Sequence, residues 1–328
     1  MYRKVRPLFF ICQTPTHVGS GSELGVVDLP IQRERHTGFP KFEASSIKGS
    51  LREAIERQVS SGGDESGQEM IHRVFGFDDD GVSESIKNKF KKNGKVESFA
   101  GAIGFTDARL LLFPVKSMRG VFAWVTCLRA LKQFARDMQL VDPTFEFVGV
   151  NADFIGTNEV YLFNPDSSLK VNGNCIVLEE FTFEVSNELN GVLQIKTNAG
   201  TENFPDWLAK ELFNDNGSYW SEKIKKDIVV LPDDDFTDFV NMSTEVVTRT
   251  KIDNATGTVK DGALFNEEYL PAESVLYTLV LTANEFKKEG MKEEDVFKFF
   301  KSNLPEVVQI GANATLGKGI VTTKIVEL

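Results

Sequence analysis

The chain has 328 residues, of which 41% are hydrophobic and 26% charged, and its formal net charge is -11 at pH 7. This length and hydrophobic content predict one large core, or one core with a substantial inserted subdomain, and exclude a disordered chain. The acidic balance argues against a free-standing nucleic-acid binder, because non-specific affinity comes mainly from Lys and Arg side chains on phosphates.

The sequence also argues against membrane-bound and disulfide-rich proteins. No stretch approaches the roughly 20 apolar residues that a membrane-spanning helix requires, and the first apolar stretch is too short for a signal peptide. Cys12, Cys127 and Cys175 are odd in number and widely spaced, so they offer neither a disulfide framework nor a CxxC metal site. We therefore expect a cytoplasmic protein without a membrane partner.

Charged residues are unevenly distributed along the chain. Acidic runs occur at 78–80 and 233–235. One short stretch contains the basic residues Arg33, Arg35, Lys41, Lys48, Arg52 and Arg57. This stretch predicts a local basic groove in an acidic protein, which suits a subunit that holds RNA only within an assembly.

The first part of the chain predicts a strand, a glycine-rich turn and a helix. Residues 6–14 have the apolar composition of a buried strand. Pro30 interrupts the extended segment that follows the turn, so this segment cannot be a central strand. Ser45 or Ser46 is suited to cap a helix that runs through Gln58.

The rest of the chain alternates strands and helices irregularly, with a mobile insertion and a weak helix at 60–98. We expect strands at 102–115, 176–184, 275–282 and 319–327, and helices near 205–213 and 292–303. Apolar residues at 118, 121, 122, 125, 128 and 131 predict a core helix after Ser117. Because regular βαβ spacing is missing, we expect residues 1–328 to form one domain with an α+β fold.

Two glycine-rich segments superficially resemble nucleotide-binding motifs. The GxGxxxG at 19–25 is one residue longer than the dinucleotide-binding fingerprint. In 310–320 (IGANATLGKGI), five residues instead of four lie between Gly311 and the Gly317-Lys318 pair, and Gly319 stands where a P-loop needs Ser or Thr. We therefore reject both nucleotide-binding interpretations. The second segment remains open to two interpretations, a tight turn or a phosphate-binding loop assisted by Lys318.

Four polar residues have ordinary structural interpretations when each is taken alone. His17 is typical of a structural histidine, and Asp28, before Leu-Pro, is typical of a turn. Lys48 and Arg52 are typical of charge on a solvated helix face.

Residues 246–271 predict two extended arms around polar turns, which taken alone could be an exposed hairpin. Glu267 and Glu268 lie side by side on the second arm, and paired carboxylates can help to hold a divalent cation. Adjacent residues on a strand point to opposite faces, so only one of the two can face a given site.

Five segments, in this order, carry a resemblance to a known family: THVGSGSELGVVDLPIQRE, SSIKGSLRE, GFTDARLLLFPV, RTKIDNATGTVKDGALFNEEYLP and IGANATLGKGI. Together they closely resemble the RAMP superfamily, and specifically the backbone (fourth) subunits of type III-B CRISPR (Cmr) effector complexes. The resemblance runs from about residue 8 to 328, except for 60–98 and 185–240.

The resemblance implies a ferredoxin-like, RRM-related core with inserted subdomains and a thumb β-hairpin, the insertion and thumb region being about 185–268. Copies of such a subunit line up as a helical filament on a guide crRNA, together with other Cmr subunits. Each thumb interrupts the duplex of guide and target RNA at about every sixth nucleotide and flips one base out.

The resemblance also implies that Asp28 carries target-RNA cleavage, with a divalent metal (Mg or Mn), and that the product is a 2′,3′-cyclic phosphate. The ordinary pKa of an aspartate side chain, about 3.9, is poorly matched to a general base at neutral pH, which favours metal binding or orientation of the 2′-OH. His17, Glu267 and Glu268 are secondary catalytic candidates. The expected RNA-binding residues are Lys48, Arg52, Arg249, Lys251, Phe265, Gly311, Gly317, Lys318 and Gly319.

Three other functions remain open at this point. The chain is a binding-only backbone subunit if Asp28 merely shapes a turn. It is a metal-independent, guide-processing endonuclease if His17 is the base. An α+β enzyme that acts on a small molecule or a metal, unrelated to RNA, is the third alternative.

Overall fold

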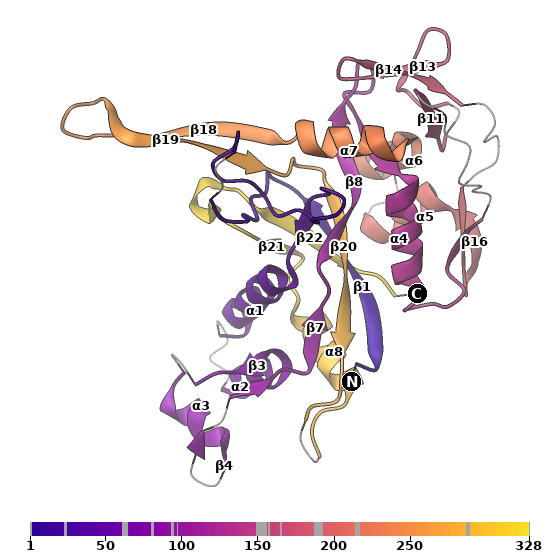
Figure 1. Cartoon of the computed structure of the whole chain (residues 1–328). Helices are drawn as coiled ribbons and strands as arrows, with labels where there is room; N and C mark the ends of the chain where they lie inside the picture. Colours follow the sequence, from indigo (N-terminus) through magenta and orange to yellow (C-terminus); the bar gives the residue numbers. More distant parts are fainter. Residues whose placement is uncertain are drawn as a thin grey trace.

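The structure is a computed structural model that describes residues 2–22, 25–60, 65–79, 82–92, 95–96, 98–148, 156, 158–164, 166–186, 193–213, 217–286 and 289–327. Within these residues, the largest sheet contains thirteen strands in the order β12-β13-β14-β11-β17-β9-β8-β20-β1-β22-β21, with β2 paired to β8 and β7 to β20. Helices cover both faces of the sheet (Figure 1). The mixed fold agrees with the expected α+β class.

The first half of the chain contains β1 (Lys4–Cys12), β2 (Lys41–Phe42), α1 (Ala44–Ser60), α2 (Glu65–Phe75), β3 (Gly76–Phe77), α3 (Glu84–Lys89), β4 (Lys91–Lys92), β5 (Lys95–Val96), β6 (Phe99–Ala100), β7 (Ile103–Phe105), β8 (Ala108–Lys116), β9 (Phe122–Cys127), α4 (Leu128–Met138), β10 (Glu146–Val148) and β11 (Glu159–Leu162).

The second half contains β12 (Lys170–Val171), β13 (Cys175–Leu178), β14 (Phe181–Val185), β15 (Gln194–Thr197), β16 (Gly200–Asn203), α5 (Phe204–Leu212), α6 (Tyr219–Lys226), β17 (Ile228–Leu231), α7 (Asp233–Met242), β18 (Glu245–Ile252), β19 (Val259–Tyr269), β20 (Val275–Thr282), α8 (Glu293–Asn303), β21 (Val307–Gln309), the 3-10 turn η1 (Ala314–Leu316) and β22 (Ile320–Ile325).

Strand β1 lies at the centre of the fold and is buried on both faces. It pairs antiparallel with β20 on one side and with β22 on the other. Leu8, Phe10 and Cys12 point into one hydrophobic core, which also contains side chains of α1, α2 and α8. Phe9 and Ile11 point into a second core with side chains of α4, α5 and α6. The alternating side chains of one strand therefore join both layers of helices to the sheet.

The expected helix over the first basic stretch is confirmed, but its cap was predicted wrongly. Helix α1 begins at Ala44 instead of after Ser45 or Ser46. The Ala44 N–H donates to Asp107 Oδ1 at 2.9 Å. A carboxylate from another part of the chain therefore satisfies this helix end, which a search for local capping residues cannot find.

The helix expected directly after Ser117 was also predicted wrongly. Residues 122–127 form strand β9, and the helix, α4, begins only at Leu128. Met118 and Val121, expected on the buried face of a helix, are 74% and 75% exposed. A short run of buried apolar residues fits a core strand as well as a helix, and here pairing with β8 and β17 decides for the strand.

The insertion at 60–98 contains more structure than the expected weak helix. Helix α2 places Ile71, Val74 and Phe75 in the first core, and α3 and the short strands β3 to β6 follow it. Residues 61–64, 80–81, 93–94 and 97 of this insertion lie outside the described residues, as do 187–192 and 214–216 of the region 185–240.

Strands β18 and β19 form the expected pair of extended arms. They are antiparallel, with Glu245 opposite Tyr269 at the base and Ile252 opposite Val259 toward the tip. The hairpin projects from the body of the molecule beside α7 (orange in Figure 1), and seven of the eight residues of β18 are exposed. The hairpin therefore extends into solvent and is anchored only at its base.

None of the helices within the described part of the chain is long and apolar enough to cross a membrane.

Candidate nucleic-acid interface

Three segments from distant parts of the chain meet at the base of the β18–β19 hairpin. They are the N-terminal loop (residues 13–32), the end of β19, and the C-terminal loop (residues 310–319). Thr16 and Leu270 exchange both backbone hydrogen bonds at 2.9 Å, which joins the N-terminal loop to the chain just after β19. Most of the residues that the family resemblance singles out lie at this junction.

Asp28 lies in the N-terminal loop with an exposed side chain. Its Oδ2 accepts a hydrogen bond from the Asn266 N–H of β19 at 2.7 Å. The next residue, Leu29, donates its N–H to the Asn266 carbonyl at 3.0 Å, so backbone pairing holds the segment along β19. Within the described residues, Asn266 is the sole hydrogen-bond partner of the Asp28 carboxylate, which leaves Oδ1 available to a ligand.

Glu268 holds the Asp28 segment against the hairpin. Its buried carboxylate accepts hydrogen bonds from the Ile31 N–H at 3.0 Å and from Thr244 Oγ1 at 2.8 Å. Arg33 Nη2 lies 2.5 Å from Glu268 Oε1 in an ion pair. Both oxygens are therefore engaged within the protein, which makes Glu268 a positioning residue in this structure.

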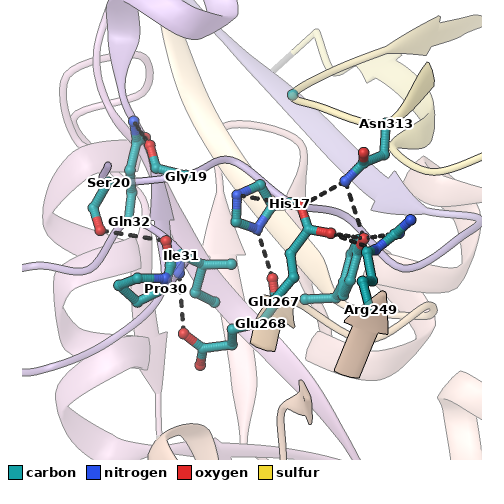
Figure 2. A network of polar contacts seen from close by, with 12 residues as sticks. His17, Gly19, Ser20, Pro30, Ile31, Gln32, Arg249, Glu267, Glu268 and Asn313 are labelled. Atoms are coloured by element: carbon teal, nitrogen blue, oxygen red, sulfur yellow. Dashed lines mark hydrogen bonds and ion pairs between the residues drawn. The ribbon is translucent and has the colours of Figure 1, made fainter. Parts of the chain in front are cut away.

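Glu267 points to the opposite side of β19 and forms the centre of a buried polar cluster (Figure 2). Tyr269 OH donates to Glu267 Oε2 at 2.5 Å, and Asn313 Nδ2 donates to Oε1 at 2.6 Å. Arg249 Nε lies 2.7 Å from Oε2, and His17 Nε2 lies 3.8 Å from Oε1. The expectation that the two adjacent glutamates face opposite sites is confirmed.

Burial raises the pKa of the Glu267 carboxyl, but its partners outweigh burial. Hydrogen bonds from Tyr269 and Asn313, followed by the charges of His17 and Arg249, lower the pKa below its ordinary value. Glu267 is therefore ionised at neutral pH, and it links β18, β19 and the two loops electrostatically.

His17 is buried, and the structure favours a structural role for it. Its Nδ1 lies 2.6 Å from the Glu268 carbonyl oxygen. A carbonyl oxygen can only accept, so Nδ1 carries the hydrogen. A Cβ at Gly19 would lie 2.6 Å from His17 Nε2, so Gly19 has to be small to let the ring pack beneath the loop.

Tyr269 and Asn313 are members of this cluster that were not among the expected site residues. Tyr269 could have been found, because side chains two apart on a strand face the same way as Glu267. Asn313 has no comparable signal, since it reaches the cluster from a loop in which its own φ is 64°. Lys318 Nζ lies 5.0 Å from the centre of the Tyr269 ring, which places this expected RNA-binding residue beside the cluster.

The glycine-rich C-terminal loop is shaped by close packing. Gly311 and Gly319 have φ of 85° and 71°, and a Cβ on either would lie 2.2 Å and 2.1 Å from a backbone oxygen. The N–H groups of Gly317, Lys318 and Gly319 are all hydrogen-bonded to backbone carbonyls. These contacts favour the tight-turn interpretation over a backbone phosphate cradle, and they leave the Lys318 side chain as the group most suited to meet a phosphate.

Lys48 and Arg52 lie on α1, and of the two only Arg52 is held by hydrogen bonds or ion pairs within the described residues. Burial, followed by the charge of Arg52, lowers the pKa of Lys48 below its ordinary value. Arg52 is engaged by Glu56 at 2.7 Å and by the Gly76 carbonyl and His72 Nδ1 at 3.2 Å each. Its guanidinium is therefore directed into the protein.

The remaining expected RNA-binding residues lie on the hairpin. Arg249 and Phe265 are opposite each other in the register and half-buried, whereas Lys251 is exposed further out. Arg249 forms an ion pair with Glu267 at the base of the hairpin. Lys251 and Phe265 therefore remain the candidates on the hairpin for contact with RNA.

Asp28 is the candidate ligand for a divalent cation at this junction. No group of three or more His, Cys, Asp or Glu side chains with metal-binding geometry occurs among the residues that the structure describes. Glu267 and Glu268 are fully engaged, whereas Asp28 has an available carboxylate oxygen. Mg²⁺ is commonly held by one or two carboxylates with water and substrate phosphates, so Asp28 fits a metal that RNA helps to bind.

Known proteins resemble the whole chain. A family model described as the RAMP superfamily matches residues 9–322. A Pyrococcus furiosus protein named CRISPR system Cmr endoribonuclease Cmr4 is 34% identical over 322 residues, with 96% of this chain and 93% of that protein covered. The CRISPR system CMR subunit Cmr4 of Saccharolobus solfataricus is 27% identical over 332 residues, with 98% and 96% covered. The crystal structure of oligomeric Cmr4 from Pyrococcus furiosus matches with a TM-score of 0.64 and 28% identity, covering 99% of this chain and 98% of that one. The chain therefore belongs to the RAMP superfamily.

Proposed function

We propose that this chain is a backbone subunit of a Cmr-type CRISPR effector complex, that it binds guide RNA, and that it cuts complementary target RNA beside Asp28. The observation that carries the proposal is the end-to-end similarity to a relative named as a Cmr endoribonuclease. The exposed Asp28 carboxylate, fixed by β19 at the junction of three segments, supports a site for a strand at that point.

The proposal extends to the architecture. We take β1, α1, β8, β20, α8 and β22 to be the ferredoxin-like core, since their strands lie in the order β22-β1-β20-β8 and are antiparallel. We take β18–β19 to be the thumb, which would separate guide and target strands and flip a base out. Its projecting, largely exposed arms support this assignment.

Cleavage at this site needs the 2′-OH of one ribose to be aligned with its own phosphate. Asp28 accepts a hydrogen bond from that hydroxyl and orients the oxygen toward phosphorus. The 2′ oxygen loses its proton to water and bonds to phosphorus, the bond from phosphorus to the 5′ oxygen breaks, and that oxygen takes a proton from water, so that a 2′,3′-cyclic phosphate and a 5′-hydroxyl result. Mg²⁺ or Mn²⁺, held by Asp28 and RNA, would supply positive charge beside the phosphate. We assign Lys48 and Lys318 to contacts with neighbouring phosphates.

The test compares two substitutions, Asp28→Ala and Asp28→Asn, in complexes assembled on guide RNA and mixed with labelled complementary RNA. The Asn variant keeps an oxygen that can accept the Asn266 N–H, so it removes the charge and preserves the loop. We expect both to cut at least about 100-fold more slowly and to bind guide and target RNA normally. Undiminished cutting by either variant at the same positions contradicts the catalytic assignment and favours a binding-only subunit.

Metal removal separates the remaining alternatives. We expect EDTA to stop cutting of target RNA by the unaltered complex, and added Mg²⁺ or Mn²⁺ to restore it. Cutting of repeat RNA by the isolated chain in EDTA would instead support the guide-processing endonuclease with His17 as base. The burial of His17 weighs against that alternative, and membership of the RAMP superfamily weighs against a small-molecule enzyme.

A further inference from the structure

A polar cavity, here called the α4 cleft, is lined by none of the residues of the hairpin base. Its volume is about 570 Å³, within the range of ligand-binding pockets. Helix α4, the start of α7 and the segment 34–39 form its walls, and β8 and β20 contribute its floor. The charged and titratable residues that line it are Glu34, His36, Arg109, Arg129, Lys132, Arg136, Asp233 and Tyr277.

The acidic groups of the α4 cleft are already engaged by the protein. Glu34 Oε1 lies 3.3 Å from Arg109 Nη1. Asp233 Oδ1 accepts the Arg129 backbone N–H at the start of α4 at 3.1 Å. Beneath them, Tyr277 OH donates to the Asp137 carboxylate at 2.8 Å. The floor is thus a satisfied polar network that has no need of a ligand.

The basic groups on the rim are different. Arg129, Lys132 and Arg136 stand at i, i+3 and i+7 on α4, all exposed, so they form one stripe about 10 Å long along the helix axis. Within the ranges that the structure describes, none of the three side chains has an ion pair or hydrogen bond. Three like charges held side by side repel one another unless an anion lies between them.

The stripe is unusual for this chain. The formal net charge is -11, yet four Arg or Lys residues line the cleft against two carboxylates. Leu110, Leu128 and Leu231 line the same cavity, so apolar surface lies beside the positive rim. A nucleotide unit matches both features, since it joins a phosphate to a base with an apolar face.

The α4 cleft is connected to the proposed cleavage site by one short segment. Asp28 lies at the start of this segment, and Glu34, His36 and Phe39 lie in the cleft wall. Glu34 follows Asp28 by six positions, which limits their Cα atoms to about 20 Å apart. Arg33 joins this segment both to Glu268 and to the Val240 carbonyl of α7, at 2.9 Å. A single RNA strand of a few nucleotides can therefore reach from Asp28 to the cleft.

We propose that the α4 cleft binds backbone phosphates of target RNA on one flank of the nucleotide held beside Asp28, through Arg129, Lys132 and Arg136. This inference rests on the proposed function, because it takes the strand that Asp28 cuts as the ligand. The cleft is a binding site and takes no part in the chemistry.

The test neutralises the stripe in the assembled complex with Arg129→Gln, Lys132→Gln and Arg136→Gln together. Affinity for complementary RNA is measured in 50 and 200 mM salt, under EDTA so that the RNA stays intact. Each single-strand phosphate contact contributes about 0.7 to the slope of log affinity against log salt. Loss of three contacts should lower the slope by about 2, so that the fourfold rise in salt weakens binding about 20-fold less than in the unaltered complex.

The matched control neutralises three exposed cations outside the cleft, with Arg3→Gln, Lys116→Gln and Lys298→Gln. It changes the net charge of the chain equally and should leave the salt slope unaltered. Thermal unfolding of both triple variants checks that each is folded. Cutting positions set by Asp28 are expected to persist in the cleft variant.

The outcomes separate this inference from the proposed function. An unaltered complex that neither binds nor cuts complementary RNA overturns the proposed function and this inference with it. A complex that binds and cuts normally, with the same salt slope in the cleft variant as in the wild type, overturns the inference alone. An equal loss of slope in the control overturns it too. If millimolar adenosine monophosphate binds the cleft with the same affinity whether or not target RNA is bound, the cleft is assigned to a free nucleotide instead.

Discussion

At the scale of single residues, alanine substitutions at Gly311 and Gly317 can distinguish the cost of backbone strain from the cost of a steric clash within one loop. Both have positive φ, 85° and 69°. Alanine at either should cost about 1 to 2 kcal/mol for the left-handed conformation. A Cβ at Gly311 would also lie 2.2 Å from the His17 carbonyl oxygen, whereas nothing lies within 4 Å of one at Gly317. We expect Gly311→Ala to lower the free energy of unfolding by a further 1 to 3 kcal/mol or so, measured by urea denaturation.

Target cutting should follow the same order, because the contact at Gly311 joins the C-terminal loop to the loop that carries Asp28. Gly317→Ala serves as the control for strain alone. Equal losses of stability in the two variants would show that the contact with His17 contributes nothing.

The sequence predicted some of the site residues and missed others for a physical reason. Alternation along a strand was enough to place Glu267 and Glu268 on opposite faces. The same alternation places Tyr269, two positions after Glu267, on the same face as Glu267. Asn313 enters the cluster through a tertiary contact with a strand that ends 44 residues earlier in the chain, and no local pattern encodes such a contact.

At the scale of elements, the hairpin β18–β19 can be shortened without touching its anchored base. Thr250 and Leu264 are opposite each other in the register, so Asn-Gly in place of residues 251–263 should close a two-residue turn between them. The described residues removed are mostly exposed. We therefore expect the free energy of unfolding to change by less than about 0.5 kcal/mol. Cutting of target RNA by the assembled complex should fall at least about tenfold, because the proposed thumb would no longer reach the duplex.

The control keeps the length of the hairpin and replaces only the tip, residues 253–258, with Gly and Ser. Normal cutting by this control and loss of cutting in the shortened variant would assign the effect to reach. Cutting by the shortened variant at the usual rate and positions would contradict a thumb role for this hairpin.

Helices and strands were predictable where the pattern of apolar residues fits only one type of secondary structure. Strand β20 and helix α8 lie within one residue of their expected bounds. Strand β9 was mistaken for a helix because the apolar residues from 118 to 131 fit a helical period. The run FAWVTC is buried along almost its whole length between β8 and β17, and burial on both faces removes the alternation that identifies a strand.

At the scale of the whole molecule, the sheet is built from pairings that no local signal predicts. Leu8 of β1 is opposite both Thr278 and Ile325, so the N-terminal strand lies between two strands from the C-terminal part of the chain. The order of elements along the chain could be predicted, but their order in the sheet depends on which distant surfaces bury each other. The junction at the hairpin base follows from this sheet order, since it brings the N-terminal loop, β19 and the C-terminal loop together.

The net charge of -11 leads to a prediction about assembly. An acidic chain repels RNA overall, so one copy should hold a short RNA weakly. Copies that contact one another along a longer RNA gain effective concentration, which typically strengthens binding by about 10²- to 10⁴-fold.

We expect the isolated chain to bind a 36-nucleotide RNA at least about 100-fold more tightly than a 12-nucleotide RNA. Both RNAs are compared at equal total nucleotide concentration in 50 mM salt, so that the number of phosphates is the same. Sedimentation should show several copies on the longer RNA, and the affinity should fall steeply by 200 mM salt. Equal affinity for the two lengths, with one copy bound to each, would mean that this chain does not line up along RNA by itself.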